Sequence, residues 1–159
     1  MNVNNFTIKV QETLQQAQQL AFDAGNQSIE TGHLLKALLA ENGDIVGFLM
    51  KKNNVNLVFL NAKLDEQLQK YPKVSGEGGQ FMSRDANTVL MRASSNIKDF
   101  KDEFVSVEHL LLAILDGNDE TAKLLKDVGL ITNGLRTAIL ELRKGSTVNT
   151  QSGDSQYNA

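Results

Sequence analysis

The chain has 159 residues, 41% of them hydrophobic and 22% charged, and carries a net charge of −3 at pH 7. This composition is ordinary for one soluble globular domain. The absence of cysteine excludes disulfides and thiolate chemistry, and the scattered lysines and arginines argue against a nucleic-acid-binding surface. No apolar run approaches the roughly 20 residues that a membrane helix needs. The opening residues lack the apolar segment of a signal peptide. We therefore expect a cytoplasmic protein without membrane contact.

The composition also indicates the fold class. A single proline and many Leu, Ala, Gln and Lys residues favour helix, and no segment shows sustained strand alternation. We therefore predict an all-α fold.

Four helices are predicted in the first half, from apolar side chains that recur every three or four residues. They cover residues 6–24, 30–41, 44–52 and 56–69. Thr7 is the expected N-cap of the first, because its hydroxyl can accept a hydrogen bond from a free backbone N–H of the first turn. Residues 72–82 begin at the proline and are glycine-rich, so we predict a connecting loop there.

The second half predicts four more helices. They begin at Ser83 or Asp85, Ser106, Asp119 and Thr132, and the last ends near residue 143. Residues 146–159 are polar and rich in Gly, Ser and Asn, so they offer little apolar surface to offset the entropy of ordering. We expect this segment to be a flexible linker toward a further part of a longer protein.

The two halves carry the same helix. Residues 29–39 read IETGHLLKALL and residues 105–115 read VSVEHLLLAIL, at an offset of 76 positions. The identical pairs are His33/His109, Leu34/Leu110, Leu35/Leu111, Ala37/Ala113 and Leu39/Leu115. Such a repeat indicates two copies of one helical unit packed against each other. We predict a pseudo-twofold pair of four-helix repeats, about residues 3–70 and 83–145.

The sequence offers little catalytic chemistry. It has no nucleophile elbow and no lysine-containing phosphate loop. A small metal-dependent helical enzyme would have to use His33, His109 and Glu108. The simpler interpretation places each histidine in the first turn of its helix, where a ring nitrogen bonds a loop carbonyl or a backbone N–H. Asp102 and Glu108 would then complement the helix dipole, which is worth roughly 0.3–1 kcal/mol.

The repeated sequence motif resembles that of a known family. The pattern E-x-x-H-L-x-x-A-L-L at residues 30–39, echoed by Glu-His-Leu at 108–110, is similar to the Clp N-terminal domain over about residues 3–145. That domain is a pair of four-helix repeats ahead of AAA+ ATPase modules. YPKVSGEGGQ at residues 71–80 and the polar stretch after Lys144 are most similar to the inter-repeat loop and linker of ClpB-type disaggregases. Gly32 stands where protease-coupled relatives tend to carry glutamate, which favours the disaggregase type.

The resemblance implies a non-catalytic domain that captures exposed stretches of unfolded or aggregated polypeptide in a groove between the repeats. The family's polar positions match Thr7, Asp102 and Glu108, and we add Leu90 and Phe104 as apolar groove residues. It implies no cofactor here, with ATP and magnesium bound by ATPase modules elsewhere in the protein. The implied partners are the rest of the chain, a homohexamer and an Hsp70-type cochaperone system. The alternative is an N-domain of a protease-coupled Clp ATPase that docks adaptor proteins.

Overall fold

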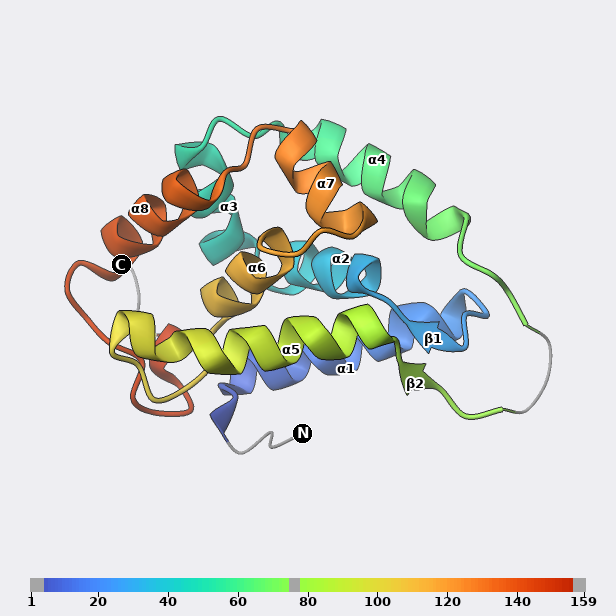
Figure 1. The fold of residues 1–159 in the computed structure, drawn as a ribbon, viewed down its shortest axis with the longest axis horizontal. Helices are drawn as coiled ribbons and strands as arrows, with labels where there is room; N and C mark the ends of the chain where they lie inside the picture. The colour runs from blue at the N-terminus through green and yellow to red at the C-terminus, as the bar shows by residue number, and fades with distance from the viewer. Residues whose placement is uncertain (1–4, 75–77, 156–159) are drawn as a thin grey trace.

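The computed structural model describes residues 5–74 and 78–155, and over this part of the chain the predicted all-α fold is confirmed (Figure 1). The α-helices are α1 (Ile8–Asp23), α2 (Thr31–Glu41), α3 (Gly43–Lys52), α4 (Leu57–Gln69), α5 (Arg84–Asn96), α6 (Val107–Leu115), α7 (Glu120–Asp127) and α8 (Thr132–Arg143). Two short 3-10 helices follow α5 and α8, at η2 (Ile97–Phe100) and η3 (Gly153–Ser155). None of the helices described is long and apolar enough to span a membrane.

Equivalent side chains start equivalent helices. The Thr7 hydroxyl accepts a hydrogen bond from the Val10 N–H at 3.2 Å, which confirms Thr7 as the N-cap of α1. Ser83, 76 positions later, caps α5 in the same way through the Ala86 N–H at 3.0 Å. Ser83 is therefore the cap, and Asp85 lies in the first turn, where its charge complements the helix dipole.

The helices pair as a doubled unit would require. At the centre, α2 contacts α6, while α1 packs on α2 and α5 on α6. The other helices cross between the halves: α3 packs on α8, and α4 packs on α7 (Figure 1). Helix α3 is equivalent to α7, and α4 is equivalent to α8. Exchanging the two halves therefore converts the contact between α3 and α8 into the contact between α7 and α4. The arrangement is the predicted pseudo-twofold pair of four-helix repeats.

Two short strand pairings also join the halves. Strand β1 (Ser28–Ile29) pairs in parallel with β2 (Phe81–Met82), and an isolated parallel bridge joins Phe6 to Val105. Shifting residues 6 and 29 by 76 gives 82 and 105, so the two pairings are themselves equivalent. The sequence did not predict them, because two residues are too few for alternation to show. β2 lies inside the predicted loop 72–82, whose residues 75–77 fall outside the described part.

The core centres on the repeated helices. Every residue of α6 is buried, and most of α2 is buried with it. This burial explains why the apolar motif occurs twice. Each copy forms the central helix of its own repeat, and the two copies contact each other.

Part of the segment that we expected to be a flexible linker, residues 146–155, packs against the domain. Val148 has no exposed surface, and Asp154 is 1% exposed. The backbone N–H groups of Glu103 and Phe104 both donate to the Val148 carbonyl, at 2.9 and 3.1 Å. Composition indicated little to bury, but backbone hydrogen bonds and one buried carboxylate hold the segment against the domain. Residues 156–159 lie outside the described part.

Candidate functional site

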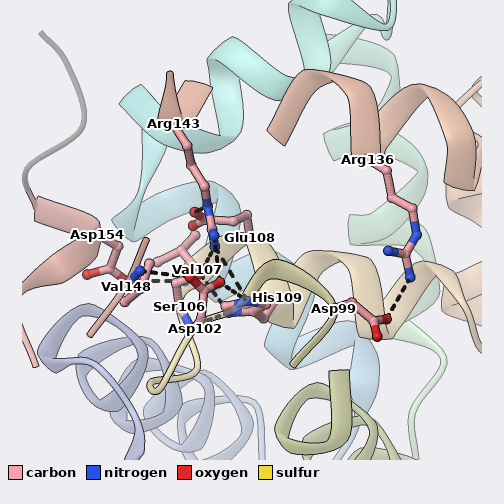
Figure 2. Close-up of polar contacts among 10 residues, drawn as sticks. All are labelled: Asp99, Asp102, Ser106, Val107, Glu108, His109, Arg136, Arg143, Val148 and Asp154. Carbon is pink, nitrogen blue, oxygen red and sulfur yellow. Dashed lines mark hydrogen bonds and ion pairs between the residues drawn. The ribbon is translucent and has the colours of Figure 1, made fainter. Parts of the chain in front are cut away.

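A buried ionic cluster occupies the second repeat (Figure 2). The Arg143 guanidinium, at the end of α8, bonds Asp102 Oδ2 through Nη1 at 2.5 Å and Glu108 Oε2 through Nε at 3.1 Å. The three side chains are 3%, 0% and 0% exposed. The guanidinium also lies 5.0 Å from the centre of the Phe100 ring. One cation therefore neutralises two buried carboxylates that come from a loop and from α6.

His109 completes the cluster from the first turn of α6. Its Nδ1 accepts the Ser106 backbone N–H at 2.8 Å, so Nε2 carries the proton and donates to Asp102 Oδ2 at 2.8 Å. Burial would raise the pKa of Asp102, but the hydrogen bonds from His109, Val148 and Arg143 outweigh it and hold the pKa below its ordinary value. The structural interpretation of the histidine is confirmed.

The first repeat builds a version of the same cluster without the buried arginine and its two carboxylates. His33 Nδ1 accepts the Glu30 N–H at 2.9 Å, and His33 Nε2 bonds Asn26 Oδ1 at 3.0 Å. Asn26 stands 76 positions before Asp102, and Gln67 stands 76 positions before Arg143. Gln67 bonds the Tyr71 hydroxyl at 2.9 Å. Both repeats thus fix their histidine in the same way, but only the second does so with a buried arginine–carboxylate cluster.

Gly32 shows why the first repeat lacks the Glu108 carboxylate. A Cβ at Gly32 would meet the Tyr71 hydroxyl oxygen at 2.3 Å and Gln67 Nε2 at 3.0 Å. The phenol and the amide fill the space that a side chain at this position would enter, so the carboxylate of the second repeat cannot be accommodated there.

A pH dependence follows from His33. Burial lowers the pKa of His33 to about 4, so the folded domain holds it neutral while the unfolded chain takes up a proton below about pH 6.5. We expect the His33 contribution to the free energy of unfolding to fall as the pH drops from about 6.5 toward 4, whereas Asp154, whose pKa burial raises to about 6, contributes in the opposite direction over nearly the same range. Urea titration of His33→Gln beside the unchanged chain isolates the histidine: the variant should lose less stability on acidification, and identical profiles would assign the pH dependence to other groups.

The polar residues implied by the resemblance lie inside the protein. Thr7 and Glu108 have no exposed surface, and Asp102 is 6% exposed. The structure brings the three into one region, because the Thr7 hydroxyl donates to Asp154 Oδ2 at 2.6 Å, and Glu108 is near enough to raise the pKa of Asp154. Sequence reasoning missed the two partners Arg143 and Asp154.

The two apolar groove candidates are placed differently. Leu90 is 3% exposed and belongs to the core on the inner face of α5, so in this structure it does not line an open groove. Phe104 is half-buried and packs against the same core.

Hollows lie at two of the seams between the repeats. The hollow between α4 and α7 is lined by Lys63, Glu66, Gln67, Lys70, Glu120, Lys123, Leu124 and Asp127, most of them charged. The one between α3 and α8 is lined by Lys52, Asn53, Asn133, Gly134, Thr137, Ala138 and Glu141, and more of its surface is apolar than polar.

No arrangement for a metal ion is seen either. Over residues 5–74 and 78–155, no three or more His, Asp or Glu side chains come together as a metal site would require. His33 and His109 each use both ring nitrogens within their own repeat. The proposed metal set of His33, His109 and Glu108 is not assembled.

Comparison with known proteins gives the family. Residues 5–128 match the family described as the Clp repeat (R) N-terminal domain. The chain belongs to this family. The Clp domain is 44% identical over 159 residues to the chaperone protein ClpB of Porphyromonas gingivalis, covering 100% of this chain and 18% of that protein. It is 41% identical over 157 residues to ClpB of Bacteroides thetaiotaomicron, covering 99% and 18%.

Solved structures show the same fold. The crystal structure of the Hsp104 N-terminal domain from Candida albicans superimposes with a TM-score of 0.83 at 22% identity, covering 95% of this chain and 99% of that one. The N-terminal domain of the chaperone ClpD from Arabidopsis thaliana gives a TM-score of 0.68 at 23% identity, covering 91% and 98%. The resemblance to Clp N-terminal domains of the ClpB type is confirmed.

Proposed function

We propose that this Clp domain is the non-catalytic, client-binding domain of a ClpB-type disaggregase, which engages exposed segments of unfolded or aggregated proteins and passes them to an ATPase pore. The observation that carries the proposal is the 44% identity to a ClpB chaperone over all 159 residues. The chain spans 18% of that relative's length. ATP and magnesium binding, a homohexameric ring, a cytoplasmic location and work with an Hsp70-type system are therefore proposed for the longer protein.

The surface suits weak binding of unfolded segments. Large apolar side chains that are about half or more exposed include Ile8, Phe22, Val58, Phe59, Val74, Phe81, Met91, Ile131 and Leu140. Val58 on α4 is 82% exposed, and Phe59 beside it is 50% exposed. Unfolded chains present apolar side chains and free backbone groups, so scattered apolar contacts favour many sequences weakly, and weak binding permits handover.

The decisive experiment compares an unfolded with a folded protein. Fluorescently labelled lactalbumin, either reduced and carboxymethylated or native, is titrated with the domain, and anisotropy is recorded. We expect saturable binding of the unfolded form at micromolar to submillimolar concentrations and none of the native form. Binding of neither form up to millimolar domain would refute client capture. Selective binding of folded partner proteins would instead support the adaptor-docking type of Clp domain.

A further inference from the structure

Residues 148–155 lie on the domain as a separate peptide would, and they end in a turn and the 3-10 helix η3. Val148 donates its N–H to Asp102 Oδ1 at 2.7 Å and accepts from the N–H groups of Glu103 and Phe104. The Ile8 N–H donates to the Gln151 carbonyl at 2.8 Å. The partners belong to the loop before α6 and to the start of α1, so backbone groups far away in the sequence hold this segment in place.

Two side chains anchor the segment. Val148 is fully buried in the hydrophobic core cluster. Asp154 is 1% exposed, and its Oδ2 accepts the Thr7 hydroxyl at 2.6 Å and the Val107 N–H at 3.2 Å (Figure 2 shows Asp154 near Val107). Thr7 caps α1, and Val107 is the first residue of α6. The carboxylate thus sits where two helix N-termini meet, and both favour negative charge.

The carboxylate is held incompletely. Asp154 Oδ1 and Glu108 Oε1 are buried, and neither has a hydrogen-bond partner among the described residues. Burial raises the pKa of Asp154 to about 6 and the Glu108 charge adds to the rise, although the Thr7 hydrogen bond lowers it. An unsatisfied buried oxygen weakens docking, so this occupant can be exchanged for a better one.

In both repeats a side chain at the equivalent position bonds the backbone of a later segment. Only the second repeat also buries a carboxylate from that segment. In the first repeat, Asn26 Nδ2 donates to the Pro72 carbonyl at 3.0 Å, and residue 72 is 76 positions before Val148. The position 76 residues before Asp154 is Gly78, which carries no side chain. The acidic anchor is therefore a property of the second repeat alone.

We propose that the surface beneath residues 148–155 is a docking site for one polypeptide segment, and that residues 148–155 themselves fill it in cis. A client segment with a small apolar residue and, six positions later, a carboxylate takes its place. The replacement by a client segment rests on the proposed function, whereas the binding of residues 148–155 to their own domain does not. Displacement frees the Thr7 hydroxyl, the Val107 N–H and Asp102 Oδ1 for the client, so these buried groups become binding groups.

The test uses a capped, fluorescein-labelled peptide of residues 146–155, STVNTQSGDS, and the full chain with its own segment weakened. Asp154→Ala removes the acidic anchor. Gly153→Ala leaves it in place but brings a Cβ to 2.7 Å from Val148 Cγ1 and 3.2 Å from Val148 Cα. Ser152→Ala, at an exposed neighbour, is the matched control. Circular dichroism and urea midpoints verify that each variant is folded.

We expect both anchor variants to bind the peptide about tenfold or more tightly than the unchanged chain and Ser152→Ala, because a tethered segment competes at roughly millimolar effective concentration. A peptide with alanine at the aspartate position should bind about tenfold more weakly. Equal affinities for all four proteins, or no binding to any at millimolar peptide, would overturn the docking site. Independently of any variant, excess peptide should speed amide exchange at Gly153 and Ser155 in the unchanged chain.

A competition experiment separates the two proposals. Carboxymethylated lactalbumin should displace the peptide from Asp154→Ala and should bind that variant more tightly than the unchanged chain. If the peptide binds but lactalbumin binds nowhere, the proposed client function fails and the docking site stands. If lactalbumin binds all variants equally and displaces no peptide, client capture stands and the docking site is not where it occurs.

Discussion

Arg143→Met is expected to lower the free energy of unfolding by about 3–5 kcal/mol, because it leaves two buried carboxylates without their cation. The Asp102 and Glu108 side chains have no exposed surface with which to recover hydration. Methionine retains most of the aliphatic packing of the arginine. The measurement is urea unfolding at pH 7, followed by far-UV circular dichroism.

The first repeat supplies the matched control for this variant. Gln67 is the equivalent residue, 5% exposed, and its amide bonds the neutral hydroxyls of Tyr71 and Thr121. Gln67→Met should cost about 1–3 kcal/mol, since it strands only neutral groups. In a Glu108→Gln background, Arg143→Met should cost less than it does alone. Equal costs at the two equivalent positions would show that charge burial does not control the stability of the cluster.

The second large effect is expected at the centre of the fold. Leu111, in the middle of α6, is fully buried. Leu111→Ala should lower the free energy of unfolding by about 2–5 kcal/mol, because the removed methyl groups leave a cavity that the surrounding core only partly fills. Leu35→Ala, the equivalent change in α2, should fall in the same range.

Leu140→Ala is the control for cavity formation. Leu140 is 61% exposed on α8, so the same chemical change should shift the free energy of unfolding by no more than about 0.5 kcal/mol. Denaturant titration of all three variants gives the comparison. A cost at Leu111 no larger than that at Leu140 would mean that the repeated helix is not the core of the domain.

Local signals explain what the sequence could predict. Helix positions followed from apolar spacing within one turn, and Thr7 and Ser83 were recognisable as caps because the hydroxyl acts on a backbone group three residues away. The offset of 76 located both central helices and both histidines. Applied further, the same offset makes Asn26 equivalent to Asp102 and Gln67 equivalent to Arg143, but it does not show that Asp102 and Arg143 meet.

Long-range pairing explains the rest. Arg143 meets Asp102 across 41 positions, and Thr7 meets Asp154 across 147 positions. Neither contact leaves a local pattern. The packing of residues 146–155 was missed because composition averages over a segment, whereas here Val148 and Asp154 alone account for its buried side chains. Thr7 and Asp102 bond Asp154 and Val148 of this segment, so these contacts could not be inferred while the segment was taken for a linker.

The pairing of Gly32 with the Tyr71 hydroxyl bears on how a duplicated domain can evolve. In a homodimer made from one 76-residue unit, the same residues must line both equivalent pockets. Once the copies are fused in a single chain, one pocket can exchange its ions for a phenol and an amide while the other keeps its arginine. A side chain introduced at position 32 alone would meet the phenol oxygen, so the two halves of this protein are not interchangeable at this position.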